Sequence, residues 1–235
     1  MARLRIDVWS DIACPWCYVG KRRLEAALGL FPHRAEVEVV WRAFELDPTA
    51  PPEKDLSLSY AARLAKKYGS SVREAEARIV QLTETARADG LDFRFDQIRP
   101  GNTFDAHRLL HLARERGIQD AVKERFLRAY MTEGEPIGRR DALVRLGTEV
   151  GLDPAEASDA LERGLFSDQV RADEQEAHTL GVSGVPCFVL AQRYAVSGAQ
   201  PAKHLLQALD QAWTALASSP LVFAEGAACG PEGCA

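Results

Sequence analysis

The sequence lacks the features that mark membrane and nucleic-acid-binding proteins. Its 235 residues contain no apolar run long enough to cross a bilayer. The formal net charge is −5 and the longest basic run is Lys21-Arg22-Arg23, so nucleic acid is not expected as a partner. Internal repeats and low-complexity segments are also missing. The remaining composition, 46% hydrophobic and 27% charged, is that of an ordinary globular protein.

The N-terminus lacks the continuous apolar segment of an export signal. Residues 3–9 instead alternate Leu4, Ile6 and Val8 with charged residues, which predicts a strand. We therefore expect a cytoplasmic protein. For the oligomeric state we expect a monomer or a dimer. Structural disulfides are rare in the cytosol, where cysteine pairs more often serve catalysis, redox sensing or metal binding.

Cysteine is scarce, and its five copies are unevenly placed. Cys14 and Cys17 form a C-x2-C pair, Cys229 and Cys234 form a C-x4-C pair, and Cys187 stands alone. An odd number of cysteines in three places does not fit a disulfide framework. A chain of this length can bury a core without disulfides or metals. The pairs are therefore candidates for chemistry rather than for stability.

The hydrophobic pattern predicts an α/β fold. Residues 3–9 and 36–42 alternate like strands on either side of an amphipathic helix. Strand patterns return at 184–196, and a last helix follows from Pro201 to about Ala217. The chain thus runs β-α-β, then a large all-helical insertion, then β-β-α. The boundaries that we expect are 1–48 and 181–217 for the sheet domain, 49–180 for the insertion, and 218–235 for a flexible C-terminal tail carrying the C-x4-C pair.

The insertion is rich in helix-forming residues, with one stretch, Asp92–Phe95, that has extended character. Asp153-Pro154 has the composition of an N-cap followed by a first-turn proline. The helices that we expect are Leu56–Tyr68, Val72–Ala88, Phe104–Arg116, Asp120–Met131, Arg139–Val150, Pro154–Arg163 and Asp168–Leu180.

Cys14 and Cys17 fall between the first strand and the first helix. Unpaired amide groups and the helix dipole favour a thiolate at this place, so we expect Cys14 to be an exposed nucleophile of lowered pKa. Cys17, one turn inward, would resolve a mixed disulfide. Pro15 lies at the start of the helix, where the lack of a backbone N–H removes no helical hydrogen bond. Trp16 is expected to offer an apolar face to substrates. The same C-x2-C is also half of many zinc sites.

Three motifs resemble the DsbA-type oxidoreductases of the thioredoxin superfamily, and within them the FrnE-like cytoplasmic branch. They are Asp11–Gly20, Gly181–Pro186 with Ser197–Pro201, and Asn102–Leu109, in a resemblance that covers residues 3–215. The resemblance implies a thioredoxin fold with a helical insertion. It also implies disulfide oxidation, reduction or isomerisation in protein or peptide substrates.

Site residues follow from the same resemblance. Cys14 is implied as nucleophile and Cys17 as resolving thiol, with Val185 and a cis Pro186 in the substrate-binding loop. Pro15 and Trp16 complete the expected substrate surface. No cofactor or metal is expected beyond the redox-active disulfide, and glutathione or another thiol could supply electrons.

Two features depart from the family pattern. Cys187 directly follows the proline, and we interpret it as a small buried strand residue rather than an extra redox thiol. Cys229 and Cys234 flank a turn-forming Gly-Pro-Glu-Gly tip. Our hypothesis is an auxiliary dithiol that exchanges electrons with Cys14–Cys17 or protects it. The alternative is a solvated tail with two unimportant thiols.

Other interpretations use the same residues. Both cysteine pairs could ligate one zinc ion in a redox sensor. A glutathione-dependent isomerase or transferase of related fold is disfavoured, because such relatives typically carry serine where this chain has Cys14. His107 and His111 stand one helical turn apart without an evident third metal ligand, and Asp11 is interpreted as a loop cap rather than a proton relay.

Overall fold

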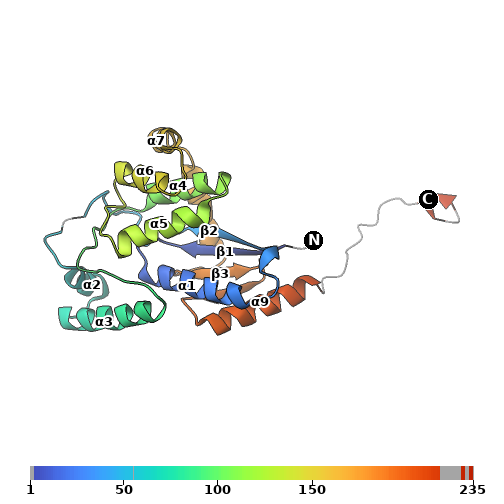
Figure 1. Cartoon of the computed structure of the whole chain (residues 1–235), viewed down its shortest axis with the longest axis horizontal. Helices are drawn as coiled ribbons and strands as arrows, with labels where there is room; N and C mark the ends of the chain where they lie inside the picture. The colour runs from blue at the N-terminus through green and yellow to red at the C-terminus, as the bar shows by residue number, and fades with distance from the viewer. Residues whose placement is uncertain (1–2, 55, 218–228, 231–232, 235) are drawn as a thin grey trace.

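The computed structural model describes residues 3–54, 56–217, 229–230 and 233–234 (Figure 1). The strands are β1 (Leu4–Ser10), β2 (Val37–Ala43), β3 (Cys187–Leu190), β4 (Tyr194–Ser197), β5 (Cys229–Gly230) and β6 (Gly233–Cys234). The helices are α1 (Pro15–Leu30), the short 3-10 turn η1 (Arg34–Glu36), α2 (Tyr60–Tyr68), α3 (Val72–Ala88), α4 (Phe104–Glu115), α5 (Gln119–Met131), α6 (Arg140–Thr148), α7 (Pro154–Glu162), α8 (Ser167–Thr179) and α9 (Ala202–Ala217).

Strands β1 to β4 form one mixed sheet in the order β2-β1-β3-β4. β1 and β2 are parallel and joined through α1, with Leu4 opposite Val37. β3 lies antiparallel to β1, with Val8 opposite Phe188, and β4 returns antiparallel to β3. The segments before and after the helical block therefore complete a single sheet, as the sequence predicted.

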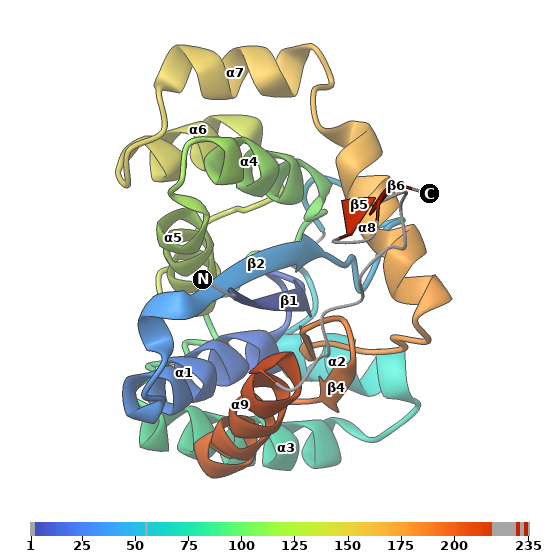
Figure 2. The same ribbon diagram turned by 90° about the vertical axis from the view of Figure 1, so that its right-hand side faces the viewer.

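Helices cover both faces of the sheet (Figure 2). Leu4, Ile6 and Val8 point to one face and pack with Leu24 of α1 and Leu209 of α9. The next residue, Trp9, points to the opposite face, where it packs against Ala177 of α8. This alternation follows from the two-residue period of a strand, and it places the helical insertion on the second face.

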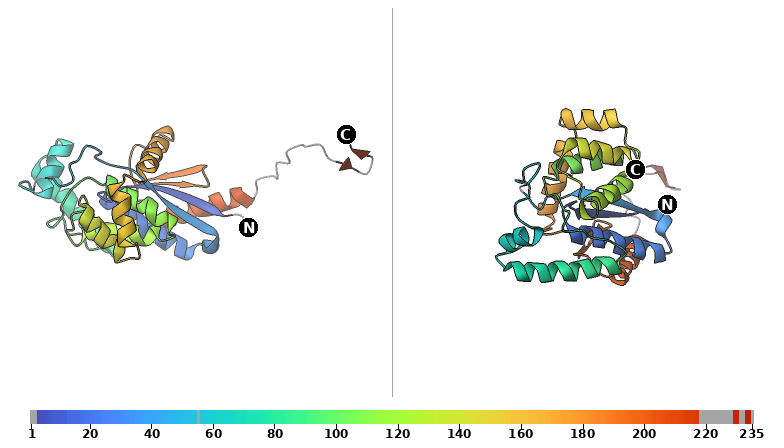
Figure 3. Two further views of the ribbon diagram at one scale, coloured as in Figure 1. Left: turned by 90° about the horizontal axis from the view of Figure 1, so that it is seen from above. Right: turned by 60° about the vertical axis from the view of Figure 1, so that its left-hand side comes forward.

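The insertion has a main bundle and a separate pair of helices. A large buried cluster joins α4, α5, α6 and α7, with Leu109, Phe126 and Leu143 fully buried in it. α2 and α3 pack on each other around Ala65 and Ala75. They lie beyond the end of the sheet where β1 leads into α1 (Figures 1 and 3). This end of the molecule also carries the cysteine pair.

A side-chain amide fastens the insertion to the edge of the sheet. The Trp41 N–H donates to Gln119 Oε1 at 3.0 Å, and Gln119 Nε2 donates to the Trp41 carbonyl oxygen at 2.9 Å. The Trp41 N–H and carbonyl oxygen lie at the outer edge of β2, and both hydrogen bonds are buried. Gln119, the first residue of α5, thus takes the place of a neighbouring strand.

One expected helix boundary in the insertion is wrong, and the stretch expected to be extended joins no sheet. α2 begins at Tyr60 rather than Leu56, because Ser59 caps the helix by accepting the Ala62 N–H at 3.1 Å. Within the described residues Asp92–Phe95 forms no strand; its two phenylalanines are buried in the main bundle instead.

The ends of the chain are only partly covered. Most of the expected tail, 218–235, lies outside the described residues. The described part of the tail is β5 and β6, in which Cys229 pairs with Cys234. In the described part of the chain, no helix has both the length and the apolar character to cross a membrane.

Candidate active site

Cys14 and Cys17 lie where β1 runs into α1. Cys14 is the residue before the helix, with φ −95° and ψ 112°, and Pro15 is the first helical residue. The Cys17 N–H donates to the Cys14 carbonyl oxygen at 3.0 Å and closes the first turn. The pair therefore lies at the positive end of α1, as predicted.

The two thiols differ in exposure. Cys14 keeps 5% of its surface exposed and Cys17 keeps none. Trp16 between them is 42% exposed and Pro15 is half-buried, so an apolar surface adjoins Cys14. The predicted exposure of Cys14 is therefore wrong, because the chain buries both thiols, although Cys14 lies nearer the surface than Cys17.

The loop before β3 lies against Cys14. The Val185–Pro186 peptide bond is cis, as the resemblance implies, and the Cys14 thiol donates to the Val185 carbonyl oxygen at 3.6 Å. Gly20 of α1 permits this approach: a Cβ there would stand 2.9 Å from Pro186 Cγ and 3.2 Å from Phe188 Cζ. The missing side chain at Gly20 therefore sets how closely the loop and the cysteine helix pack.

Asp11 holds the turn between β1 and the cysteines. Its buried carboxylate accepts the Ala13 N–H at 3.2 Å and the Leu46 N–H at 2.8 Å, the capping role that we predicted. His107 of α4 faces the same carboxylate, with Nε2 3.5 Å from Oδ1. Burial raises the pKa of Asp11, but His107 and the two N–H groups outweigh it and hold the pKa below its ordinary value.

The two histidines of α4 serve different carboxylates. His107 faces Asp11, whereas His111 Nε2 lies 3.0 Å from Oδ2 of Asp173 in α8. Asp173 in turn pairs with Arg42 of β2 at 2.7 Å. Among the described residues, no group of three or more His, Cys, Asp or Glu side chains is placed to hold a metal. His107 thus connects the insertion to the sheet domain directly, whereas His111 acts through Asp173, which pairs with Arg42.

Lys123 of α5 brings a positive charge to the buried side of the cysteine pair. Its side chain is fully buried, and Nζ donates to the Ser10 carbonyl oxygen at 3.4 Å. Ser10 is the last residue of β1, and its buried hydroxyl has no hydrogen-bond partner among the described residues. Burial lowers the pKa of Lys123 to about 8, although Cys17, Asp11 and Cys14 act to raise it.

The two thiols interact, and their pKa values shift in opposite directions. The hydrogen bond with Cys17 raises the pKa of Cys14, and burial adds to this rise. Burial also raises the pKa of Cys17, but the hydrogen bond with Cys14, the charge of Lys123 and the Ser10 hydroxyl bring it below its ordinary value. The pKa of Cys14 is thus raised, not lowered as predicted, because the hydrogen bond with Cys17 and burial both act in that direction.

The other three cysteines lie outside this pair. Cys187 begins β3 and is buried, and its burial raises the pKa of the thiol, which fits the predicted strand residue. Backbone pairing sets Cys229 opposite Cys234 across β5 and β6. The side chains of these two residues lie outside the described part of the structure.

Sequence analysis missed two residues beside the thiols. Tyr60 begins α2, and burial, followed by the nearby Cys14, raises its pKa to about 12. Nothing in the local pattern marks Tyr60. Lys123 did leave a signal, since Gln119, Val122, Lys123 and Phe126 follow the i, i+3, i+4, i+7 spacing of one buried helix face. Because lysine is almost never fully buried without a partner, a lysine on such a helix face indicates a buried polar contact.

Three known proteins are similar to this chain in sequence or in fold. A structure of a probable DsbA oxidoreductase from Streptomyces coelicolor is 47% identical, with a TM-score of 0.88 and 99% of each chain covered. The uncharacterised protein YwbO of Bacillus subtilis is 29% identical over 189 residues, which are 80% of this chain and 86% of that protein. The cytosolic disulfide reductase DsbM from Pseudomonas aeruginosa, solved with GSH, shares the fold at 22% identity and a TM-score of 0.56, with 90% of this chain and 96% of that chain covered.

The sequence model of the DSBA-like thioredoxin domain matches residues 5–210, which include the cysteine pair, the helical insertion and the proline loop. With its β-α-β and β-β-α halves joined in one sheet, the chain belongs to the DSBA-like thioredoxin domain family.

Proposed function

We propose that the protein is a thiol–disulfide oxidoreductase in which Cys14 attacks protein or peptide substrates and Cys17 resolves the mixed disulfide. The observation that carries this proposal is the placement of the pair at the start of α1, with Cys14, the less deeply buried thiol, in contact with the loop of the cis Pro186. Pro15, Trp16, Val185 and Pro186 would form the substrate surface around it. Contact between the Cys14 thiol and the Val185 carbonyl oxygen supports this placement.

The chemistry is a two-step exchange. As substrate approaches, the proton of Cys14 passes to Cys17, and the Cys14 thiolate attacks one sulfur of the substrate disulfide. That S–S bond breaks, and the leaving sulfur takes the electron pair and then a proton from solvent. Cys17 loses its proton to solvent and attacks the Cys14 sulfur, which releases the second substrate thiolate. Two electrons have then passed to the substrate, and the reverse sequence oxidises a substrate dithiol.

A redox titration tests the proposal. The purified protein would be equilibrated with defined glutathione buffers, alkylated and mapped by mass spectrometry at each potential. We expect one reversible two-electron transition at Cys14–Cys17, and its midpoint would separate oxidase, reductase and isomerase roles. Cys17→Ser should trap substrate on Cys14, whereas Cys14→Ser should trap none. Absence of any Cys14–Cys17 disulfide across the titration would refute the proposal.

The same titration tests the auxiliary dithiol. The backbone pairing of Cys229 with Cys234 supports a pair that can close into a ring and exchange with Cys14–Cys17. A second transition at Cys229–Cys234, coupled to the first, is the expected result. If the doubly substituted Cys229→Ser/Cys234→Ser protein kept the same midpoint and turnover, the tail would have no redox role.

The proposal also includes an electron donor and a cellular compartment. Glutathione is the donor that we would test first, since DsbM of similar fold was solved with GSH. A cytoplasmic location and a monomeric or dimeric state stay predictions, which fractionation of cells and sedimentation of the purified protein would check.

A further inference from the structure

We propose that Arg23 is a positioning residue that holds the proline loop in place beside Cys14. The proline loop is Val185 with Pro186, two residues of the proposed substrate surface, so this inference rests on the proposed function. Arg23 belongs to α1, the helix that starts at the cysteine pair, and its side chain is half-buried. In the sequence it ends the longest basic run, to which the proposed function gives no role.

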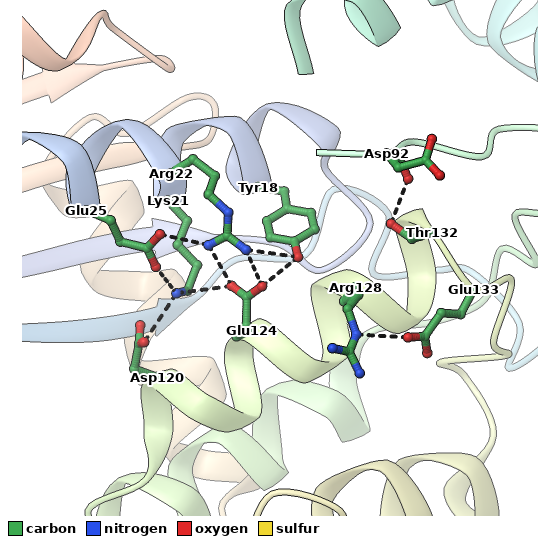
Figure 4. A network of polar contacts seen from close by, with 10 residues as sticks. All are labelled: Tyr18, Lys21, Arg22, Glu25, Asp92, Asp120, Glu124, Arg128, Thr132 and Glu133. Carbon is green, nitrogen blue, oxygen red and sulfur yellow. Dashed lines mark hydrogen bonds and ion pairs between the residues drawn. The ribbon is translucent and has the colours of Figure 1, made fainter. Parts of the chain in front are cut away.

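The three residues of this basic run contact different parts of the insertion and the sheet domain. Lys21 and Arg22 face α5, where the Glu124 carboxylate pairs with both of them (Figure 4). Adjacent residues of a helix do not face the same neighbour. The side chain of Arg23 accordingly leaves α1 in another direction and contacts the end of α3 and the turn before α9.

The guanidinium of Arg23 bridges two segments that are distant in sequence. Its Nε donates to Oδ2 of Asp89, the C-cap residue of α3, at 3.0 Å. Its Nη1 donates to the Ala199 carbonyl oxygen, in the turn between β4 and α9, at 2.6 Å. The donors of a guanidinium lie in a rigid fork, so one group can hold a carboxylate and a carbonyl oxygen together.

The turn that Arg23 holds is also bonded to the proline loop. The Gly198 N–H donates to the Pro186 carbonyl oxygen at 2.8 Å. Gly198 directly precedes the residue whose carbonyl oxygen Arg23 binds, so the two contacts move together. At its other end, the proline loop accepts a hydrogen bond from the Cys14 thiol at 3.6 Å. A connected series of contacts therefore runs from the helical insertion through Arg23 to the reactive thiol.

The position of the proline loop matters for exchange with a peptide. The attacking sulfur must be aligned with the substrate S–S bond, and small misplacements cost large factors in rate. A peptide bound across the proline loop is aligned with Cys14 only while that loop stays against α1. A small alkylating reagent needs no such alignment. Loss of the Arg23 contacts should therefore slow exchange with peptides and leave alkylation of Cys14 undiminished.

The test compares Arg23→Met with the matched control Arg22→Met in a Cys17→Ser background. Methionine keeps an unbranched apolar stem and removes every N–H donor. The probe is a short synthetic peptide whose cysteine carries thionitrobenzoate as a mixed disulfide. Cys14 attacks the peptide sulfur, the bond to thionitrobenzoate breaks, and the released thiolate is followed by absorbance, with mass mapping to assign the peptide to Cys14. We expect Arg23→Met to lower this rate about tenfold and Arg22→Met to leave it at the wild-type value.

Alkylation of Cys14 by iodoacetamide separates positioning from general damage to the site. Its rate should not fall in either arginine variant. A fall of both rates in Arg23→Met, or a peptide rate equal to that of the wild type, would overturn the inference. If the protein with wild-type arginines trapped no peptide on Cys14, the proposed function would fail instead.

Hydrogen exchange tests the hold on the proline loop without any thiol chemistry. The Gly198 amide should exchange faster in Arg23→Met than in the wild type, and at the wild-type rate in Arg22→Met. If Arg23→Met does not fold, Asp89→Ala takes its place, because loss of the carboxylate frees the guanidinium to turn away from the carbonyl oxygen that it holds. Unchanged exchange of the Gly198 amide in the folded variant would overturn the inference.

Discussion

At the scale of single residues, Gly20 controls how the cysteine helix meets the proline loop. A Cβ at this position would come within 2.9 Å of Pro186 Cγ, closer than such atoms approach in folded proteins. The loop would have to move away from α1, and with it the Val185 carbonyl oxygen that Cys14 contacts. A single methyl group at Gly20 should therefore affect both stability and thiol chemistry.

We expect Gly20→Ala to lower the free energy of unfolding by about 1–3 kcal/mol, the usual cost of overpacking. Denaturant unfolding would measure it, together with the rate of Cys14 alkylation. Gly29→Ala is the control in the same helix, because no described atom lies within 4 Å of its added Cβ. That change should stabilise the protein by about 0.5–1 kcal/mol through helix propensity. Equal effects at both glycines would contradict the close-packing explanation.

At the scale of elements, Asp173 fixes α8 to the sheet. Its carboxylate pairs with Arg42 at 2.7 Å, accepts the Ala43 N–H at 2.9 Å and lies 3.0 Å from His111 Nε2. Burial raises the pKa of Asp173, but His111, Ala43 and Arg42 outweigh it and lower the pKa below 3.8. Three elements, α8, β2 and α4, thus depend on one ionised carboxylate.

Asp173→Asn should reduce the free energy of unfolding by about 3 kcal/mol, as expected when one partner of a buried ion pair is removed. Because the folded pKa is lowered, the contribution of Asp173 is present above the unfolded value of 3.8 and is lost as the pH falls through the folded pKa. Unfolding curves at several pH values would measure this. The exposed pair Asp159–Arg163 gives the control, since Asp159→Asn should change stability by less than about 1 kcal/mol. A constant difference down to low pH would contradict the assignment.

The elements themselves were largely predictable, because each depends on local pattern. Strand alternation around Ile6 and the cysteine spacing at the start of α1 were enough to predict the β-α-β beginning of the fold and the thiol site. The partners of Asp173 and Lys123 were not predictable, because these helical residues contact strands distant in sequence. The pKa order of the two thiols was missed because it depends on their mutual hydrogen bond and their burial, whereas the sequence argument used only the helix dipole.

At the scale of the whole molecule, the insertion and the sheet domain are held as one unit by buried polar contacts. Gln119 makes two hydrogen bonds to the backbone of Trp41, and His107 reaches Asp11 beside the cysteines. Separation of the two parts would leave these groups unpaired in the interface. Since unpaired buried groups are costly, we expect the two parts to unfold together.

Gln119→Ala should lower the free energy of unfolding by about 2–3 kcal/mol, because the Trp41 N–H and carbonyl oxygen lose their partners. Hydrogen exchange at the Trp41 amide should speed up more than exchange elsewhere in β2. The exposed Gln207 of α9 provides the control, and Gln207→Ala should leave both stability and exchange unchanged. Unaltered exchange at Trp41 in Gln119→Ala would show that the amide contact contributes nothing to docking.

The amide contact at β2 also has a consequence for solubility. An open sheet edge invites extended segments of other chains to add as a further strand. Peptide substrates of the proposed disulfide exchange would bring such segments to the protein. Gln119 occupies the hydrogen-bonding groups of Trp41 that would receive them. We therefore expect no added strand to pair with Trp41 at this edge.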